Sequence, residues 1–440
     1  MTIHKNSRHT YVAALSAVVA SIMAGGLAAQ AQDTSKLEQE NQELRKRLDD
    51  MEALLEKEGL KPSGTMGTAQ PVKALTDVTI SGFVTSSYFY DLASPRDNHP
   101  TGYLWNTSMN SFEVNKIKLT LASPGVDKDK WSAAYRASFI WGADAPFVDT
   151  GSTDTAGFSW LREAYVELNV PIGTGLDIRA GQLISLLNYE SGDGGAANGN
   201  FSQGYQWWYT GNGPDAGVQL GYDFNDFIGI KVREQNGLYN GAVSTGAKTF
   251  LGGLYINPDK KTSIAILGFE GRQDSAYTTP PFLDGGSVIA SRKITENHNI
   301  NVAIEADYFN FSHAYAFVGS PDEKSHGDWW SLGAWLSADL VPKLGATVRV
   351  DYVTDPTGFG TEINSPNPAV INTSAGSGFP AGVYGSGQNL MSATLTLDYM
   401  PAPQIKIQPE IRWNHSSYSG AFATANRDQF IIGMGATYMF

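Results

Sequence analysis

The feature that most constrains this chain is an alternation of apolar and polar residues that recurs from Val78 to the last residue, Phe440. Between residues 299 and 308, and again between 404 and 414, nearly every second side chain is apolar, and most of the intervening ones are charged or carry amides. Side chains of a β-strand point alternately to the two faces of its sheet, so these segments predict strands with one apolar and one polar face. A soluble β-sandwich alternates in the same way, so a single strand does not decide the class.

The connections between these segments alternate in length. Short turns are expected at 123–130, 171–175, 223–226, 257–261, 295–298, 341–343 and 400–403. Between them lie longer, mostly polar stretches at 91–110, 142–158, 185–215, 238–247, 273–286, 312–327, 355–387 and 415–427. Transmembrane β-barrels alternate in this way, with short periplasmic turns and long external loops.

The alternation also gives a strand count. The expected strands are 78–90, 111–122, 131–141, 160–170, 176–184, 216–222, 227–237, 248–256, 262–272, 287–294, 299–311, 328–340, 344–354, 388–399, 404–414 and 428–440. Segment 287–294 is included because, without it, two consecutive strands would run in the same direction. The prediction is therefore an all-β fold: a 16-stranded antiparallel transmembrane β-barrel, with 14 or 18 strands as alternatives.

Composition excludes several other classes of protein. Charged residues make up 17% of the chain, against about 25% in typical soluble proteins. The chain has no cysteine, which rules out disulfides and thiolate zinc sites. The net charge of -13 leaves no basic surplus to neutralise phosphates, so no nucleic-acid partner is expected. Neither a cofactor nor a metal site is predicted.

The first residues, 1–31, have the organisation of a secretory signal peptide. Lys5 and Arg8 give a positive start, an uncharged apolar run follows over 11–27, and Ala29-Gln30-Ala31 offers a small-x-small cleavage pattern. An uncleaved membrane anchor is the alternative. Beyond residue 31 no apolar run of about 18 residues recurs, so any membrane span must be built from strands.

Residues 32–58 predict a periplasmic coiled-coil helix, and residues 59–77 a flexible linker rich in glycine and proline. The helix would place Glu40 opposite Arg45, and Arg47 opposite Glu52, of a parallel partner chain. A single amphipathic helix is the alternative. The apolar seam, spaced alternately by four and three residues, consists of Leu37, Asn41, Leu44, Leu48, Met51 and Leu55.

The last strand is the most specific segment of the sequence. Apolar side chains occupy every second position from Phe430 through Tyr438 to Phe440, which is the final residue. This pattern resembles the C-terminal signal of bacterial outer-membrane barrels, which the barrel-assembly machinery reads in that family. An ordinary edge strand is the alternative. The resemblance implies that Tyr438 and Phe440 act as a barrel-insertion signal.

Three internal stretches carry a narrower resemblance. They are Phe112–Leu119 (FEVNKIKL), Trp160–Leu168 (WLREAYVEL) and Asp177–Gln182 (DIRAGQ). With them, residues 78–440 resemble a Gram-negative outer-membrane porin of the OmpL-like "putative β-barrel porin 2" group. The resemblance implies passive diffusion of small polar solutes or ions through a water-filled channel. It also implies a homotrimer in outer-membrane lipid, with the N-terminal helix in the periplasm.

In porins the third external loop folds into the lumen, which suggests a constriction at 185–215 here. Its candidate residues are Glu190, Asp193, Tyr205, Trp207, Trp208 and Tyr209. The alternative is that these aromatic side chains join the interfacial girdle or cover the barrel mouth. If the loop folds inward, Glu190 and Asp193 are expected to face Lys231 and Arg233 across the narrowest point. Otherwise these two cations would pair with Glu163, Glu167 or other acids of the wall.

Charged residues on the strand parity opposite the apolar face are expected to line the lumen. The pore-lining candidates are Arg136, Glu163, Glu167, Arg179, Lys231, Arg233, Glu305, Asp307, Arg349, Asp351, Glu410 and Arg412. Lys116, Lys118, Asp177, Asp339, Asp398 and Lys406 share this parity. Selectivity depends on which of these face each other at the narrowest level.

Two other function classes are weighed against a porin. A structural or adhesin-type barrel would use the same coiled coil and long loops. An outer-membrane enzyme would need an activated nucleophile. Ser312 beside His313 and Ser416 beside His415 are sequence neighbours, and neighbours on a strand point to opposite faces. No enzymatic activity is therefore predicted.

Overall fold

The structure is a computed structural model. It describes Glu43, Lys46 and residues 78–92, 108–148, 160–211, 213–238, 246–272, 282–295, 299–315, 324–356, 388–417, 421–422 and 426–440. The chain divides into two units, Met1–Ala74 and Leu75–Phe440. The predicted signal peptide, the apolar seam of the coiled coil and the linker 59–77 lie outside the described residues.

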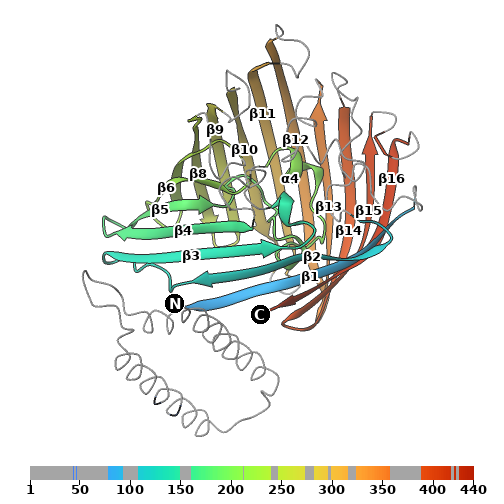
Figure 1. Ribbon diagram of the computed structural model, residues 1–440, viewed down its shortest axis with the longest axis horizontal. Coiled ribbons are helices and arrows are strands. Elements are labelled where there is room, and N and C mark those ends of the chain that lie inside the picture. The colour runs from blue at the N-terminus through green and yellow to red at the C-terminus, as the bar shows by residue number, and fades with distance from the viewer. Residues whose placement is uncertain are drawn as a thin grey trace, which may run out of the picture. The chain divides into compact units, whose positions relative to one another are not determined.

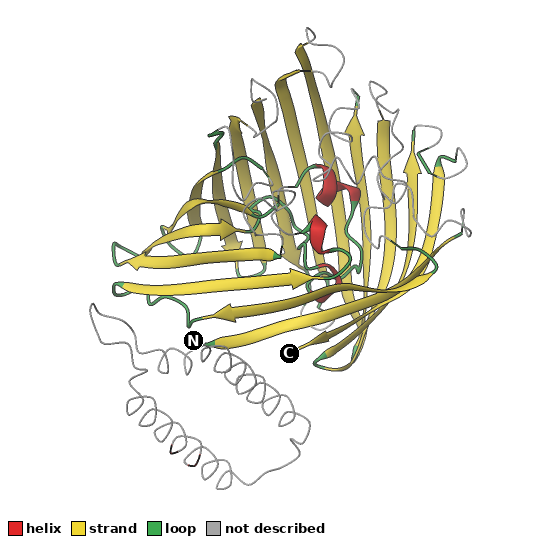
Figure 2. Cartoon of the chain, in the orientation of Figure 1, coloured by secondary structure: helices red, strands yellow, loops and turns green. Residues whose placement is uncertain are grey.

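The second unit contains sixteen strands that close into one antiparallel barrel, with β1 paired to β16 (Figures 1 and 2). The strands are β1 (Thr79–Asp91), β2 (Ser111–Ala122), β3 (Ser132–Trp141), β4 (Leu161–Val170), β5 (Leu176–Leu183), β6 (Asp215–Asp223), β7 (Ile228–Gln235), β8 (Thr249–Asp259), β9 (Thr262–Arg272), β10 (Phe282–Lys293), β11 (Asn301–Tyr315), β12 (Lys324–Val341), β13 (Leu344–Asp355), β14 (Gln388–Ala402), β15 (Ile405–Ser416) and β16 (Asp428–Met439). The predicted fold class and strand count are confirmed.

Within the described ranges, three short helical segments lie between strands. They are the 3-10 helices η1 (Ala145–Phe147) and η3 (Gly194–Ala196) and the α-helix α4 (Tyr205–Tyr209). No helix among the described residues is long and apolar enough to span a membrane.

The strand boundaries differ most from the sequence prediction at β10, which begins five residues before the expected 287. Residues 282–286 include Asp284, Gly285 and Gly286, whose composition is typical of a loop. They nevertheless form a strand because both neighbours run alongside them, with Gly285 paired to Phe269 and to Phe309. Cross-strand pairing therefore overrides local preference here.

The barrel is apolar outside and polar inside, the reverse of a soluble protein. On β16, Phe430 and Met434 are 52% and 50% exposed, whereas Gln429 and Thr437 on the opposite parity are 0% and 2% exposed. Most other strands repeat this arrangement, with exposed aliphatic and aromatic side chains on the outer surface and buried polar ones inside. An apolar outer surface of this kind is stable only in a hydrocarbon environment, where a closed barrel also leaves no unpaired strand edge.

The C-terminal residue helps to close the barrel. The Gly82 N–H donates to the Phe440 carbonyl oxygen at 2.9 Å, and the Phe440 N–H donates to the Gly82 carbonyl at 3.0 Å. A Cβ at Gly82 would lie 2.1 Å from the Lys118 carbonyl oxygen and 2.8 Å from the Phe440 ring. Glycine at this position therefore allows β1 to approach both neighbours. The role of Tyr438 and Phe440 as an insertion signal stays a prediction.

Candidate functional site

The connection between β5 and β6, residues 184–214, lies inside the barrel and is called here the inward segment. Figure 1 shows α4 within the ring of strands. In this segment α4 contacts β12, β13 and β14, and η3 contacts β1 and β16. All five residues of α4 are buried. The aromatic side chains of α4 therefore do not belong to an outer girdle.

Two wall carboxylates accept hydrogen bonds from the backbone of the inward segment. Glu410 on β15 accepts one from the Phe201 N–H at 2.8 Å and one from the Ser202 hydroxyl at 2.5 Å. Asp351 on β13 accepts one from the Tyr205 N–H, the first residue of α4, at 2.7 Å. A chain buried in a lumen must find partners for its free N–H groups, and these inward-facing acids supply them.

A second pair of wall acids, Glu305 and Asp307 on β11, holds the inward segment at Tyr189 and at α4. Glu305 accepts a hydrogen bond from the Tyr189 N–H at 2.8 Å. Asp307 accepts hydrogen bonds from the Gln206 side-chain amide at 2.5 Å and from the Thr210 hydroxyl at 2.8 Å. Both carboxylates are almost completely buried, at 1% and 4% exposed. These predicted pore-lining residues therefore support the inward segment.

Arg349 on β13 is the central cation beneath the inward segment, and its side chain is 0% exposed. Its guanidinium lies 2.8 Å from the Glu190 carboxylate and 3.4 Å from that of Asp351. It also donates to the Ser202 carbonyl and, at 2.9 Å, to the Thr394 hydroxyl. A planar guanidinium with several donors can join wall and loop in this way, which a lysine cannot do.

The neighbouring cation Arg412, on β15, completes this contact. It donates to the Gln203 carbonyl at 2.6 Å, and its guanidinium lies 4.9 Å from the centre of the Tyr205 ring. Apolar packing adds to the polar contacts, since the Phe201 and Phe89 rings stack with centroids 5.5 Å apart. A Cβ at Gly435 would lie 2.0 Å from the Phe201 ring, so β16 leaves the space that this ring fills.

A second ionic cluster holds the inward segment at η3, which begins directly after Asp193. Asp193 lies 2.6 Å from the Lys118 ammonium and 3.7 Å from the Arg162 guanidinium. Burial alone would raise the pKa of Asp193, but the charges of Lys118 and Arg162 lower it below its ordinary value. The carboxylate therefore stays ionised at neutral pH and anchors η3 near β2 and β4.

Two arginines on β3 and β5 are more open to solvent. Arg136 pairs with Glu163, and its side chain is 38% exposed. Arg179 is 34% exposed and pairs with Glu167 at 3.1 Å and with Asp177 at 3.0 Å. Lys231 on β7 is half-buried. The described part of the lumen is thus uneven: β11–β16 is covered by the inward segment, whereas Arg136, Arg179 and Lys231 on β3–β7 stay partly exposed.

The expected opposition of Glu190 and Asp193 to Lys231 and Arg233 is corrected by these contacts. The two acids pair with Arg349 and Lys118, as described above. Arg233 is 3% exposed and donates to the Gln219 side chain at 2.7 Å and to the Ile184 carbonyl at 2.9 Å. It therefore supports the base of the inward segment. The alternative partners Glu163 and Glu167 pair with Arg136 and Arg179 instead.

Arg162 is a buried cation that the sequence parity placed on the outer face. A bulge between β3 and β4 shifts the register after Ser138, which pairs with Glu163 while Phe139 pairs with Leu161. Arg162 and Glu163 are consequently both buried, at 6% and 4% exposed. No local signal in the sequence marks this bulge. Asp339, expected in the lumen, is exposed at the end of β12 and lines a hollow together with Thr347 and Lys406 of the inner wall.

The Ser-His neighbours do not form a catalytic pair where the structure describes their side chains. His415 Nδ1 lies 2.9 Å from the Asp428 carboxylate at the exposed rim. Ser416 is buried, and its hydroxyl donates to the Gln388 side chain at 3.2 Å. The side chain of His313 lies outside the described residues. Among the described residues no group of three or more histidine or acidic side chains could hold a metal ion.

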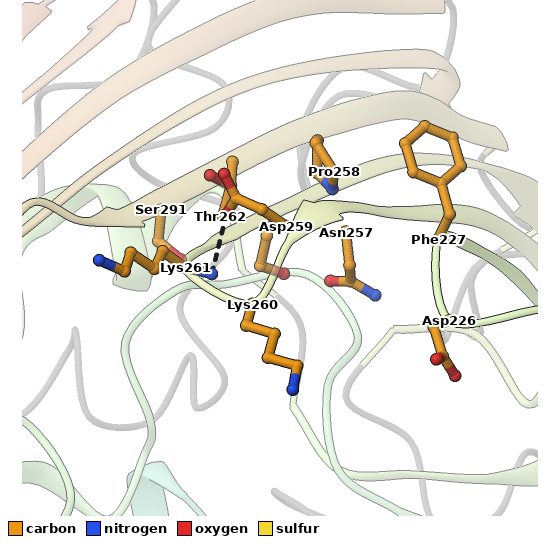
Figure 3. A pocket seen from close by; sticks show the side chains of 10 residues that line it. Asp226, Phe227, Asn257, Pro258, Asp259, Lys260, Lys261, Thr262 and Ser291 are labelled. Carbon is orange, nitrogen blue, oxygen red and sulfur yellow. Dashed lines mark hydrogen bonds between the residues drawn. The ribbon is translucent and has the colours of Figure 1, made fainter.

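Two surface hollows open at the end of the barrel that carries the short turns. One, of 480 Å³, lies between the β6–β7 and β8–β9 turns (Figure 3). Its Asp259 accepts a hydrogen bond from the Lys261 N–H at 2.8 Å and pairs with Arg292. The other, of 690 Å³, reaches from the β12–β13 turn to Asn301, Thr347 and Lys406 on the inner wall. It therefore opens toward the lumen, whereas the hollow in Figure 3 is lined by turn residues.

Comparisons with known proteins agree with this architecture. The family described as "Putative beta-barrel porin-2, OmpL-like" matches residues 77–440. An anion-selective porin from Comamonas acidovorans is 10% identical, with a TM-score of 0.51, covering 82% of this chain and 99% of that one. The outer membrane channel DcaP of Acinetobacter baumannii is 13% identical, also with a TM-score of 0.51, covering 82% of this chain and 97% of that one. At these identities the two structures show a shared fold. No curated protein matches the sequence.

Proposed function

Because the chain belongs to the OmpL-like β-barrel porin-2 family and is an outer-membrane porin, we propose that solutes cross its barrel beside the inward segment, along the wall formed by β3–β10. The channel is water-filled and carries small polar solutes or ions by passive diffusion. In this proposal the inward segment is the constriction, and its residues Glu190, Asp193, Tyr205, Trp207, Trp208 and Tyr209 narrow the lumen.

One observation carries the proposal: the difference in exposure between the two sides of the lumen. Arg349 and Asp351 are 0% exposed, whereas Arg136 and Arg179 are 38% and 34% exposed. The covered charges are satisfied by the backbone of the inward segment, so they are structural. The half-exposed charges can meet hydrated solutes, and rings of such side chains are what set selectivity in a wide pore.

Planar-bilayer recording of the full-length protein tests the proposal. We expect discrete current steps in symmetric salt, with a reversal potential in a salt gradient that shifts when Arg136 is changed to glutamate. Its partner Glu163 would then meet a like charge, so the local field at the wall changes sign. The Lys343→Glu substitution, on an exposed turn, is the matched control and should leave the reversal potential nearly unchanged. An assembled barrel that gives no current steps would refute the proposal.

We propose a homotrimer whose coiled-coil helices, residues 32–58, lie in the periplasm. In this proposal residues 1–31 are a signal peptide that is removed by cleavage. The alternating seam of the sequence and its matched charge pairs support this arrangement. A coil of about 20 residues is marginal alone, so most of the association should come from the barrels. Deleting Lys36–Glu58 is expected to weaken the trimer without abolishing it, as measured by mass in mild detergent. A monomeric mass for the intact protein would contradict the proposal.

Outer-membrane lipid and the barrel-assembly machinery are the other partners that we propose. The apolar outer surface of the barrel supports the first, and the terminal pattern ending at Phe440 supports the second. We propose no enzymatic activity, because the described serine and histidine neighbours bond to other side chains.

A further inference from the structure

One sector of the lumen wall is apolar, although the sequence pattern predicts a polar inner face throughout. Inward-facing side chains of β8, β9 and β10 form a buried cluster with Leu187 of the inward segment. Its members on these strands are Leu251, Leu267, Phe269 and Leu283. At the edge of the cluster, Tyr255, Ala265, Ile289 and Leu186 are only partly buried. The partly buried edge of the cluster therefore presents an apolar strip to the lumen.

The partly buried strip lies at one level of the barrel. Tyr255 pairs with Ala265, and Ala265 pairs with Ile289, across three adjacent strands. Side chains opposite each other on neighbouring strands are about 5 Å apart, so the three form a continuous surface. Figure 1 shows β8, β9 and β10 side by side.

Lys231 stands directly beside this strip. It pairs with Gly253, and Gly253 pairs with Leu267, one row nearer to the long-loop end than Tyr255. Its ammonium lies 4.5 Å from the centre of the Tyr255 ring. Gly253 matters here, because a Cβ would lie 2.9 Å from Leu267 and 3.0 Å from the Tyr255 ring. The glycine thus lets the ring and the cation share one surface.

Lys231 also differs from Arg136 and Arg179 in its ionic contacts. Arg136 and Arg179 each pair with a carboxylate within 4 Å. Among the residues that the structure describes, Lys231 forms no such ion pair. Its ammonium instead makes a cation–π contact with the Tyr255 ring. A half-buried ammonium without a carboxylate favours an anion from solution, since its charge is only partly solvated.

We propose that Lys231 and the strip formed by Tyr255, Ala265 and Ile289 make a subsite for small organic anions with an apolar body, such as aromatic monocarboxylates. This proposal rests on the proposed channel function and names a solute class for it. The carboxylate would lie at the Lys231 ammonium, and the apolar body would cover the strip. An inorganic anion would use only the charge, and a neutral aromatic alcohol only the strip.

Block of the chloride current in planar bilayers tests the subsite, with benzoate, acetate and benzyl alcohol as the probes. Benzoate should reach half-block at about a tenfold lower concentration than acetate, because its ring buries additional apolar area. Lys231→Gln should raise the half-blocking concentration of benzoate about tenfold, as expected for the loss of a charged hydrogen bond. Lys231→Arg should restore most of the effect, and Lys260→Gln, on the exposed β8–β9 turn, should match the wild type.

The outcomes separate the subsite from the channel. Chloride conductance with equal half-block by benzoate and acetate would overturn the subsite and leave the channel intact. The same holds if Lys231→Gln, assembled as a heat-modifiable barrel, keeps the affinity of the wild type for benzoate. An assembled wild-type barrel without current steps in any salt would overturn both the channel and the subsite.

Discussion

Replacing Arg349 with alanine is expected to release the inward segment from the wall and to raise the single-channel conductance. The substitution removes the guanidinium that pairs with Glu190 and Asp351 and leaves both acids buried without it. Breaking a buried ion pair by removing one partner costs about 3–5 kcal/mol. The released population of the segment should therefore rise by a factor on the order of 100 or more. Larger current steps, with more noise from segment motion, are the readout.

Two control substitutions distinguish the loss of the Arg349 contacts from the loss of one positive charge. Lys343→Ala also removes one cation, but this lysine is exposed on the β12–β13 turn, where it donates to the Pro401 carbonyl. Its conductance should equal that of the wild type. Arg349→Lys keeps the charge without the fork of donors and should give an intermediate conductance. Wild-type conductance in an assembled Arg349→Ala barrel would show that this residue does not hold the segment.

The strand count and the inner face of most strands could be predicted because both follow from local sequence. Strand side chains alternate with a period of two, so Arg349 and Asp351, or Glu410 and Arg412, fall on the same face wherever the strand is regular. The closed antiparallel barrel adds a second constraint, because neighbouring strands must run in opposite directions and the number of strands must therefore be even. The β10 strand was predicted on this ground, although its first residues have the composition of a loop.

What could not be predicted depends on contacts between residues distant in sequence. The position of the inward segment in the lumen decides which cation pairs with Glu190. That cation is Arg349, which is more than 150 residues away along the chain. A bulge is a property of two paired strands, so the inward turn of Arg162 leaves no mark in its own strand. The apolar sector could not be predicted either. On β9 the outward Ile266 alternates with the inward Leu267 and Phe269, so both faces are apolar there and the alternation does not show which face lines the lumen.

The two sides of the lumen thus have different roles. Along β11–β16, charged side chains are used up in holding a buried segment, where each needs a partner because an unpaired buried charge is costly. Along β3–β10, charges and an apolar strip remain partly open. A count of lumen charges would treat both sides alike, whereas selectivity should follow the open side only.

Single-cysteine accessibility tests this division most directly, because the chain contains no cysteine of its own. Ala265 on the open wall is half-buried, whereas Ser392 on β14 is 0% exposed and donates to Asp351 beneath α4. In assembled channels, a water-soluble anionic methanethiosulfonate should modify Ala265→Cys and lower its conductance. It should react with Ser392→Cys about 100-fold more slowly, given the cost of releasing the segment. Equal reaction rates at the two positions would contradict a solute path confined to the open side.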